Sequence, residues 1–347
     1  MSAGPPPRRV LVCEDSRAYA TALSRFLDHD EGIEVVGTAA SGEQAIAEVA
    51  RLRPDLLTLD MQLPGMDGLE VVERLMTESP LPIVILSGTV ARGSERAAAA
   101  LAAGALEVLP KDMLRLDRLD DVWAQAMRSR LRRLSSMRVG GAVRAPREPA
   151  PARAAQISQT VGVVGIGAST GGPPVLEAIL RELPEDFPVP VLVVQHMAPG
   201  FIEGFTRWLD RQLPIPVALA AEGARAAPGV WFAGDGSHLT LSQSGRFALD
   251  DKAEAAHRPS IDVLLESLAR AAGAEALGIV LTGMGKDGAE GTAAIRRAGG
   301  LAIAQDEASS VVYGMPRAVA EDGADLVLSP AEIASTLRSL DPARAGG

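Results

Sequence analysis

The feature that most constrains the fold is a regular alternation of two sequence patterns. Short apolar runs, typical of buried strands, alternate with segments whose apolar residues recur at helical spacing. In the first part of the chain, strands are predicted at 8–15, 33–39, 54–68 (where the strand runs into a Pro/Gly loop), 82–88 and 105–111, and helices at 16–30, 41–53, 68–78, 94–104 and about 116–136. Strict alternation of strand and helix is typical of a doubly wound parallel sheet.

The second part of the chain has the same style without repeating the sequence. Strands are predicted at 161–167, 189–195, 229–234, 277–283 and 300–305, with helices between several of them. The segment 240–250 has the pattern of a β-hairpin around Ser244 and Gly245. A length of 347 residues suits two domains. The predicted fold class is therefore α/β, with two doubly wound parallel-sheet domains.

Between the two parts, residues 137–158 lose all periodicity and are rich in Gly, Pro, Ala and Arg, which predicts a linker. Arginines cluster from Arg128 to Arg153, and only Glu148 opposes them. Two interpretations stay open for this basic segment. It is either a solvated tether or a surface that docks on an acidic partner.

Composition excludes several classes of protein. The net charge of −10, from 44 acidic and 34 basic residues, argues against a nucleic-acid binder that relies on bulk charge. The single cysteine, Cys13, lies in an apolar run, so we expect neither an internal disulfide nor a multi-cysteine zinc site. The N-terminal residues lack the apolar core of a signal peptide, and no apolar run is long enough to span a membrane. We therefore expect a cytoplasmic protein without membrane insertion.

Polar side chains end four predicted strands of the first part. Glu14 and Asp15 follow the first strand, Asp60 the third, Ser87 the fourth and Lys111 the fifth. These ends lie at one edge of a parallel sheet, where such folds place their sites. Carboxylates gathered there repel one another unless a cation joins them, and Mg²⁺ prefers a few carboxylates plus water. The hydroxyl and the lysine could hold phosphoryl oxygens.

With this pattern, residues 8–125 resemble the receiver domain of bacterial response regulators. The matching features are ED at 14–15, the run LDMQLPGMDG that contains Asp60 and ends at Gly68, and the single residues Ser87 and Lys111. The resemblance implies that Asp60 accepts a phosphoryl group from a sensor histidine kinase. It also implies that Glu14, Asp15 and Asp60 bind Mg²⁺, and that Ser87 and Lys111 contact the phosphoryl group. Two positions depart from the family pattern. Asp112 replaces a proline after the lysine, and Val108 replaces an aromatic residue, which puts a switch based on an aromatic rotamer in doubt.

In the second part, the stretch VVGIGASTGGPP at 163–174 allows two interpretations of a glycine-rich turn. As a phosphate loop it fails twice. A dinucleotide fingerprint starting at Gly165 has Thr170 where its third glycine should be, and a P-loop starting at Gly167 has Pro173 in place of its lysine. As a nucleophile elbow it fits, because GASTG is a G-x-S-x-G sequence that presents Ser169 after a strand and before a predicted helix.

A serine nucleophile needs a base and an acid that orients the base. His196 directly follows one predicted strand, and Asp287 lies in a glycine loop just after another. With Ser169, these residues lie beyond the carboxyl ends of three separate parallel strands, the edge where sites form in open α/β sheets. His238 and Asp235 form a rival pair near a fourth strand end.

Residues 159–340 resemble the catalytic domain of the chemotaxis protein-glutamate methylesterases. The matching runs are GASTGG at 167–172, QHM at 195–197, RPS at 258–260, LTGMGKDG at 281–288 and AQDEASSVVYGMP at 304–316. The segment FAGDGSHL at 232–239 is a looser match, with Gly234 where a proline is common. The resemblance implies that Ser169 is the nucleophile, His196 the general base and acid, and Asp287 its orienting carboxylate. The remaining implied active-site residues are Thr170, His257 and Met284, the last through its backbone N–H.

The two resemblances imply a receiver domain at 8–125 with a flavodoxin-like fold, a helix end and Gly/Pro/Arg linker at 126–158, and a Rossmann-like methylesterase domain at 159–345. The implied reaction is hydrolysis of γ-glutamyl methyl esters on chemoreceptors, releasing methanol, with deamidation of receptor glutamines as a second activity. Ester hydrolysis needs no cofactor. We expect the unphosphorylated receiver to cover the site and phosphorylation of Asp60 to release it.

Two other functions are weaker alternatives. A small-molecule esterase of the α/β-hydrolase type would place its acid before a late histidine. Here Asp287 follows His196, and the last histidine, His257, is far from the C-terminus. A non-catalytic adaptor would not need the complete set of Ser, His and Asp.

Overall fold

The computed structural model describes residues 6–88, 95–137, 139 and 160–340. It divides into two compact units, Met1–Gly141 and Ala142–Gly347, and each is considered by itself. Most of the predicted linker at 137–158 lies outside the described residues. The prediction of two α/β domains with parallel sheets is confirmed.

The first unit is built on a five-stranded parallel sheet with the order β2-β1-β3-β4-β5. Its strands are β1 (Arg8–Cys13), β2 (Ile33–Ala39), β3 (Leu56–Asp60), β4 (Ile83–Ser87) and β5 (Glu107–Pro110). β3, β4 and β5 are buried along their whole length, which is why their sequences are continuous apolar runs. The order reverses between β1 and β3, and ligand sites of this fold form at that point.

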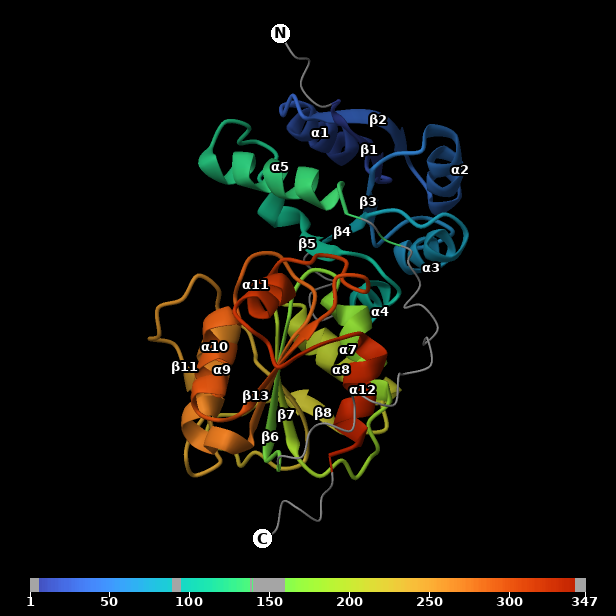
Figure 1. Cartoon of the computed structure of the whole chain (residues 1–347). Helices are drawn as coiled ribbons and strands as arrows, with labels where there is room; N and C mark the ends of the chain where they lie inside the picture. Colours follow the sequence, from blue (N-terminus) through green and yellow to red (C-terminus); the bar gives the residue numbers. More distant parts are fainter. Residues whose placement is uncertain (1–5, 89–94, 138, 140–159, 341–347) are drawn as a thin grey trace. The chain divides into compact units, whose positions relative to one another are not determined.

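Helices cover both faces of this sheet, with α1 and α5 together on one side and α2 and α3 on the other (Figure 1). Their bounds are α1 (Arg17–Asp28), α2 (Gly42–Leu52), α3 (Gly68–Glu78), α4 (Glu95–Ala102), the 3₁₀ helix η2 (Lys111–Leu114) and α5 (Val122–Leu134). The prediction of a helix from about 116 was wrong at its start. The Asp121 carboxylate accepts a hydrogen bond from Ala124 N–H and caps α5, so the helix begins at Val122.

The second unit contains a seven-stranded sheet with the order β14-β13-β12-β6-β7-β9-β8, parallel throughout. The strands are β6 (Val163–Ala168), β7 (Pro190–Gln195), β8 (Val217–Leu219), β9 (Gly229–Phe232), β12 (Ala276–Val280), β13 (Leu301–Gln305) and β14 (Leu326–Leu328). The sequence did not predict β8 and β14. Both are three-residue edge strands that are only partly buried, so neither produces a continuous apolar run.

The predicted hairpin is confirmed. β10 (His238–Leu241) pairs antiparallel with β11 (Phe247–Asp250), and Gly245 adopts a positive φ of 70° in the turn. The hairpin is attached to the middle of the helix that follows it, at 261–272, since Leu241 N–H donates to Ser267 Oγ at 3.0 Å. It therefore forms a small separate sheet beside the main one.

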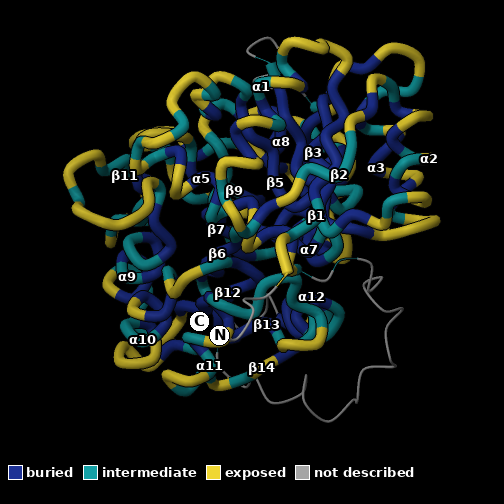
Figure 2. The backbone as a smooth tube through the Cα atoms, turned by 90° about the horizontal axis from the view of Figure 1, so that it is seen from above, coloured by how far each residue is buried: buried dark blue, intermediate teal, exposed yellow. Residues whose placement is uncertain are grey.

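Helices lie on both faces of the larger sheet, with α9 and α10 on one side and α7, α8 and α12 on the other (Figure 1). They are α7 (Gly172–Arg181), α8 (Ile202–Gln212), α9 (Ile261–Ala272), α10 (Ala289–Arg297), α11 (Met315–Glu321) and α12 (Pro330–Arg338), with a 3₁₀ turn η3 (Gly273–Glu275). The strands are mostly buried and the connecting turns mostly exposed (Figure 2).

A glycine in β6 brings the start of α9 against the sheet. A Cβ at Gly167 would lie 2.3 Å from Cγ2 of Ile261, the first residue of α9, so only glycine allows this approach. β6 lies between β7 and β12. The strands that directly follow β6 in the chain are added on its β7 side, and the later strands β12 to β14 are added on its other side. The carboxyl ends of β6, β7 and β12 therefore meet at the switch point where open α/β sheets bind ligands.

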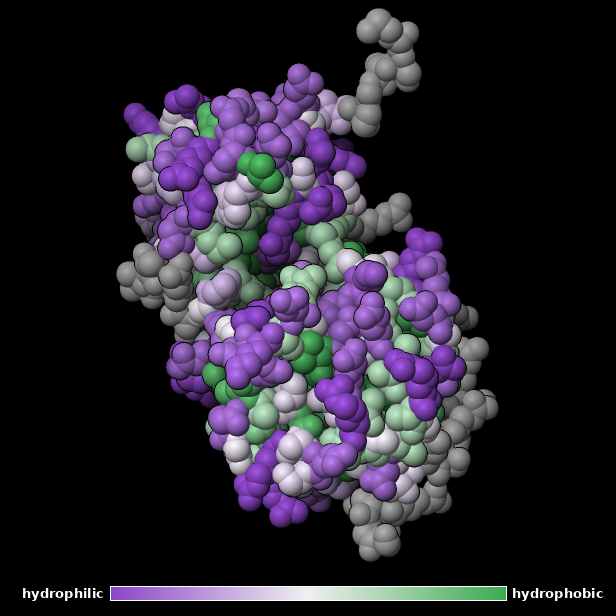
Figure 3. All heavy atoms as spheres, turned by 90° about the vertical axis from the view of Figure 1, so that its left-hand side faces the viewer, coloured by the Kyte–Doolittle hydropathy of each residue, from purple (hydrophilic) through white to green (hydrophobic). Residues whose placement is uncertain are grey.

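The visible surface of each unit is mainly hydrophilic, with hydrophobic residues in small groups (Figure 3). Among the described residues, the only large hydrophobic side chains classed as exposed are Val122 and Val327. No helix in the described ranges combines the length and the apolar character needed to cross a bilayer.

Candidate active site

The turn after β6 is held by a backbone carbonyl of the loop after β12 and by a side-chain amide at the end of β7. Ser169 N–H donates to Thr282 O at 3.0 Å, and Ser169 O accepts from Gly172 N–H at 2.8 Å. Gln195 Nε2, at the end of β7, donates to the same carbonyl at 2.9 Å. Gly171 has a φ of 74° and precedes α7, so the turn reverses sharply into the helix. The position of Ser169 is thus fixed on both sides.

Strand register brings His196 beside Ser169. Ala168 of β6 is paired with Gln195 of β7, and His196 N–H donates to Ala168 O at 2.9 Å. Ser169 and His196 are the next residues on two adjacent parallel strands, which lie about 4.8 Å apart. Gln195 Nε2 also donates to His196 O at 2.8 Å, so one buried amide fixes both residues. That His196 deprotonates Ser169 stays a prediction.

Asp287 faces the other side of the imidazole. Its Oδ2 lies 2.9 Å from His196 Nε2, and the two side chains are only 9% and 12% exposed. Because Asp287 occupies the Nε2 side, Nδ1 is the ring nitrogen that is left for the serine. An ionised carboxylate at this distance also stabilises the charged imidazolium.

The start of α9 holds the Asp287 carboxylate in place. Oδ2 accepts from Ile261 N–H, while Oδ1 accepts from Ser260 Oγ and Asp262 N–H, each at 3.0 Å. Burial alone would raise the pKa of Asp287. The bonds from His196, Asp262 and Ile261 outweigh burial and lower that pKa below its ordinary value. Asp287 is therefore ionised at neutral pH, and the positive end of the α9 dipole supports its charge.

A second acid, Asp262, holds the loop that carries Asp287. Its Oδ1 accepts from Gly288 N–H at 2.9 Å and Gly291 N–H at 2.7 Å. Burial, and then the nearby charge of Asp287, raise the pKa of Asp262 to about 6. Sequence reasoning did not single out Asp262 or Ser260. The RPS run at 258–260 was the only signal that pointed to this segment.

Buried polar groups lie beneath the serine turn. Thr282 Oγ1 donates to Thr170 O at 3.0 Å and accepts from Val312 N–H at 2.9 Å. Gln305 Oε1 accepts from Thr282 N–H at 2.8 Å. Thr282 and Gln305 are fully buried. The turn and the loop after β12 are therefore tied together, although sequence reasoning gave neither residue a role.

The structure places the three predicted supporting residues around the same point. The His257 ring stacks on His196, with centroids 4.4 Å apart and an interplanar angle of 28°. Thr170 is buried next to the serine. A Cβ at Gly283 would lie 2.7 Å from Ser169 Cβ, which puts the following residue, Met284, close to the serine. No described acceptor takes the Met284 N–H.

The structure separates the rival pair. His238 is completely buried, and both of its ring nitrogens have hydrogen-bond partners within the fold. Asp235 Oδ2 instead accepts from Gly200 N–H at 2.8 Å. Without access to substrate, His238 cannot serve as the base for Ser169.

In the first unit, the polar strand ends also come together. Glu14, Asp15 and Asp60 each offer a carboxylate oxygen, and these atoms lie within 4.8 Å of one another. Lys111 Nζ lies 2.6 Å from Glu14 Oε2 and 2.7 Å from Asp60 Oδ2. Burial is the main cause that raises the pKa of Glu14. Three oxygen donors at this spacing, two of them on buried residues, fit a divalent cation that keeps several waters.

Ser87 is buried at the end of β4, and its Oγ lies 3.4 Å from Gly88 O. Lys111 Nζ lies 4.8 Å from the centroid of the Tyr19 ring, and the Tyr19 hydroxyl donates to Lys111 O at 3.3 Å. Tyr19 thus holds the lysine from outside the acid cluster. The predicted phosphoryl contacts of Ser87 and Lys111 stay predictions.

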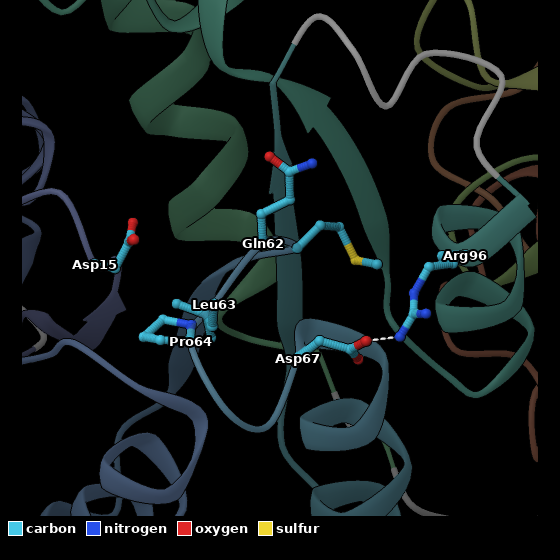
Figure 4. A pocket seen from close by; sticks show the side chains of 7 residues that line it. Asp15, Gln62, Leu63, Pro64, Asp67 and Arg96 are labelled. Atoms are coloured by element: carbon cyan, nitrogen blue, oxygen red, sulfur yellow. Dashed lines mark ion pairs between the residues drawn. The ribbon is translucent and has the colours of Figure 1, made fainter.

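A cavity of about 580 Å³ lies beside this cluster and is lined by Asp15, Met61, Gln62, Leu63, Pro64, Asp67 and Arg96 (Figure 4). Asp15 lies at one side of it, and the ion pair of Arg96 with Asp67 at the other (Figure 4). The cavity therefore borders the acid cluster at Asp15.

Comparisons with known proteins agree with this division. Residues 164–337 match the CheB methylesterase family, and residues 10–122 match the response regulator receiver domain. A protein-glutamate methylesterase/protein-glutamine glutaminase of Syntrophus aciditrophicus is 43% identical over 96% of this chain and 98% of its own length. One of Myxococcus xanthus is also 43% identical, over 96% of this chain and 97% of its own.

Among solved structures, the CheB methylesterase catalytic domain of Thermotoga maritima is similar to the second part. The match has a TM-score of 0.51 and 39% identity, and it covers 52% of this chain and all of that one.

Proposed function

Because this chain belongs to the CheB methylesterase family and carries a response regulator receiver domain, we propose that it hydrolyses γ-glutamyl methyl esters on chemoreceptors. The observation that carries the proposal is the His196–Asp287 pair, 2.9 Å apart at the strand edge where Ser169 lies. The relatives from Syntrophus aciditrophicus and Myxococcus xanthus are named for this activity, together with protein-glutamine glutaminase activity.

In the first step, Ser169 Oγ attacks the ester carbonyl while His196 Nδ1 takes the hydroxyl proton. The buried Asp287 carboxylate stabilises the resulting imidazolium. Negative charge develops on the carbonyl oxygen, and the Met284 N–H is available to donate to it. The C–OCH₃ bond then breaks, methoxide takes the proton from His196, and methanol leaves an acyl-serine.

In the second step, a water molecule loses a proton to His196 and attacks the acyl carbon. The bond between the acyl carbon and Ser169 Oγ breaks, and Oγ takes the proton back from His196. The products are a free glutamate side chain and the original enzyme. The same acyl-serine forms from a receptor glutamine if ammonia leaves in place of methanol. Thr170 and His257 lie beside the reacting groups and support their placement.

The receiver supplies the regulation in this proposal. Asp60 accepts a phosphoryl group from a sensor histidine kinase, and Ser87 and Lys111 contact its oxygens. Glu14, Asp15 and Asp60 would hold Mg²⁺, which offsets charge on the transferring phosphoryl group. Before phosphorylation the receiver restrains the esterase, and phosphorylation of Asp60 removes the restraint.

The corresponding domains are a receiver at 8–125, a helix end and linker at 126–158 and a catalytic domain at 159–345. The two compact units support this division, since they separate between Gly141 and Ala142. The two ranges matched by the families lie inside the proposed domains.

The test is methanol release from a methylated chemoreceptor fragment by the full chain. We expect Ser169→Ala to lower kcat by at least about 10³-fold, because this change removes the proposed nucleophile. The matched control is Ser244→Ala, an exposed serine in the hairpin turn, which should leave kcat unchanged. Release of methanol by Ser169→Ala at the wild-type rate would refute the assignment, and no release by the wild-type chain would refute the function.

A further inference from the structure

His238 is a completely buried histidine outside the reacting groups, and the mechanism above does not use it. It opens β10 and is 0% exposed. Ser260 N–H donates to its Nδ1 at 3.0 Å, and its Nε2 lies 3.1 Å from Ala253 O. The ring therefore bridges the hairpin, the segment after it and the start of α9.

The hydrogen-bond partners of the His238 ring determine which of its nitrogens carries a proton. A backbone N–H can only donate, so Nδ1 carries no proton. A carbonyl oxygen can only accept, so Nε2 carries one. His238 is thus held as the neutral Nε2–H tautomer.

Ser260, which His238 holds, is itself a partner of Asp287. Its hydroxyl donates to Asp287 Oδ1 at 3.0 Å, and Ser260 is also the residue that caps α9. Asp287 Oδ2 in turn faces His196 Nε2. Hydrogen bonds therefore join His238 to Ser260 and Ser260 to Asp287, and the Asp287 carboxylate faces the His196 ring at ion-pair distance.

We propose that His238 is a positioning residue, which fixes Ser260 and through it the carboxylate that orients His196. The effect on rate rests on the proposed function. The essential element is the acceptor at Nδ1, because without it the buried Ser260 N–H loses its partner. The bond from Nε2 to Ala253 fastens the ring but does not contact Ser260.

Two variants separate this role from simple filling of space. In His238→Asn, the side-chain oxygen can occupy the place of Nδ1 and accept from Ser260 N–H. In His238→Gln, the side-chain nitrogen can occupy the place of Nε2 and donate to Ala253 O, but the acceptor for Ser260 is lost. Glutamine fills the cavity better than asparagine, so a purely structural role predicts the opposite order.

We expect His238→Gln to lower kcat for methanol release by roughly 10- to 100-fold with little change in KM, since a small displacement of a catalytic group costs this much. His238→Asn should keep kcat close to that of the wild type. Unfolding temperatures of both full-length variants show how far each change affects folding. A lower kcat for His238→Asn than for His238→Gln, or equal kcat in both, would overturn the proposal.

Proton NMR of the full chain supplies a readout that does not depend on the substrate. The signal of the His196 Nε2 proton, on the nitrogen that lies 2.9 Å from Asp287 Oδ2, should persist in His238→Asn and broaden or vanish in His238→Gln. Its survival in both variants would overturn the proposal. Nitrogen NMR of the wild type should show His238 protonated at Nε2 only, and a proton on Nδ1 would also overturn it. If the wild type released no methanol while the NMR results held, the proposed function would fail and the positioning role would stand.

Discussion

At the scale of single residues, Asp287 and Asp262 are two neighbouring acids whose pKa values move in opposite directions. Asp287 has more donors, because His196 and the start of α9 both face it, and its pKa falls. Asp262 accepts from two backbone N–H groups, but burial and the charge of Asp287 raise its pKa to about 6. The fold therefore favours a negative charge on Asp287 and disfavours a second negative charge on Asp262.

This difference predicts how stability depends on pH. The pKa of Asp262 in the folded state is about 6, above its ordinary value of 3.8. The folded state therefore favours the protonated carboxyl group. Its contribution to stability is complete below pH 3.8 and is lost as the pH rises through about 6. Asp262→Asn cannot ionise, yet its side-chain oxygen can still accept from Gly288 and Gly291. We expect its stability relative to the wild type to increase between pH 4.5 and pH 7.5, measured by urea unfolding.

The exposed Asp251→Asn serves as the matched control, and its stability relative to the wild type should vary little over the same range. Asp287, with its lowered pKa, contributes stability above 3.8 and loses it as pH falls, in wild type and variant alike. A difference between Asp262→Asn and wild type that is constant, or that decreases with rising pH, would contradict the expected ionisation.

At the scale of elements, close approach between backbone segments brings the site together. Gly167 lets α9 reach the sheet, and the start of α9 then supplies three of the donors to Asp287. Gly283 does the same for the loop after β12, which lies directly against Ser169. Neither glycine adopts a positive φ, so backbone conformation does not require glycine at these positions. Glycine is required because a side chain would clash with the neighbouring segment.

Gly283→Ala tests this packing. The new Cβ would lie 2.7 Å from Ser169 Cβ and 2.3 Å from Met315 Sδ. Met315 can move its flexible end, but the serine turn is held by Thr282 and Gln195. We expect kcat for methanol release to fall roughly 10- to 100-fold, with the second unit still folded.

Gly234→Ala is the control, because nothing lies within 4 Å of its added Cβ. It should leave kcat and the unfolding temperature unchanged. Wild-type kcat in Gly283→Ala would show that the contact with Ser169 does not constrain the reaction.

At the scale of the whole molecule, two sites of different chemistry lie on one chain. The acid cluster of the first unit fits a divalent cation, whereas Ser169, His196 and Asp287 of the second unit are the residues proposed for acyl transfer. Each of these two sets of residues lies within one unit. Their coupling, as proposed above, is a change in rate that follows phosphorylation of Asp60.

We expect acetyl phosphate with Mg²⁺ to raise methanol release by the full chain about 5- to 150-fold, the usual range of coupling between two sites. Asp60→Asn should lose this response, whereas the exposed Asp117→Asn should keep it. A fragment starting near residue 155 should be faster than the unphosphorylated full chain. If it is no faster, the receiver does not restrain the esterase.

The sequence by itself determined the fold class and which residues could come together. Alternating strands and helices imply parallel sheets, and parallel connections bring all strand ends to one edge, so residues such as Glu14 and Asp60 could be grouped without coordinates. The same argument grouped Ser169, His196 and Asp287. Strands β8 and β14 were not predicted, because each has only three residues and is partly exposed, so neither forms a recognisable apolar run.

Only the tertiary structure decided what each residue contacts. Both His196 and His238 lie near strand ends in the sequence, but burial and two filled ring nitrogens distinguish His238. The donors to Asp287 come from α9, which precedes it by 25 to 27 positions, and no local pattern reports such contacts. Periodicity records which face of an element is buried, whereas hydrogen bonds between distant segments depend on how the elements pack, and that packing exists only in the folded chain.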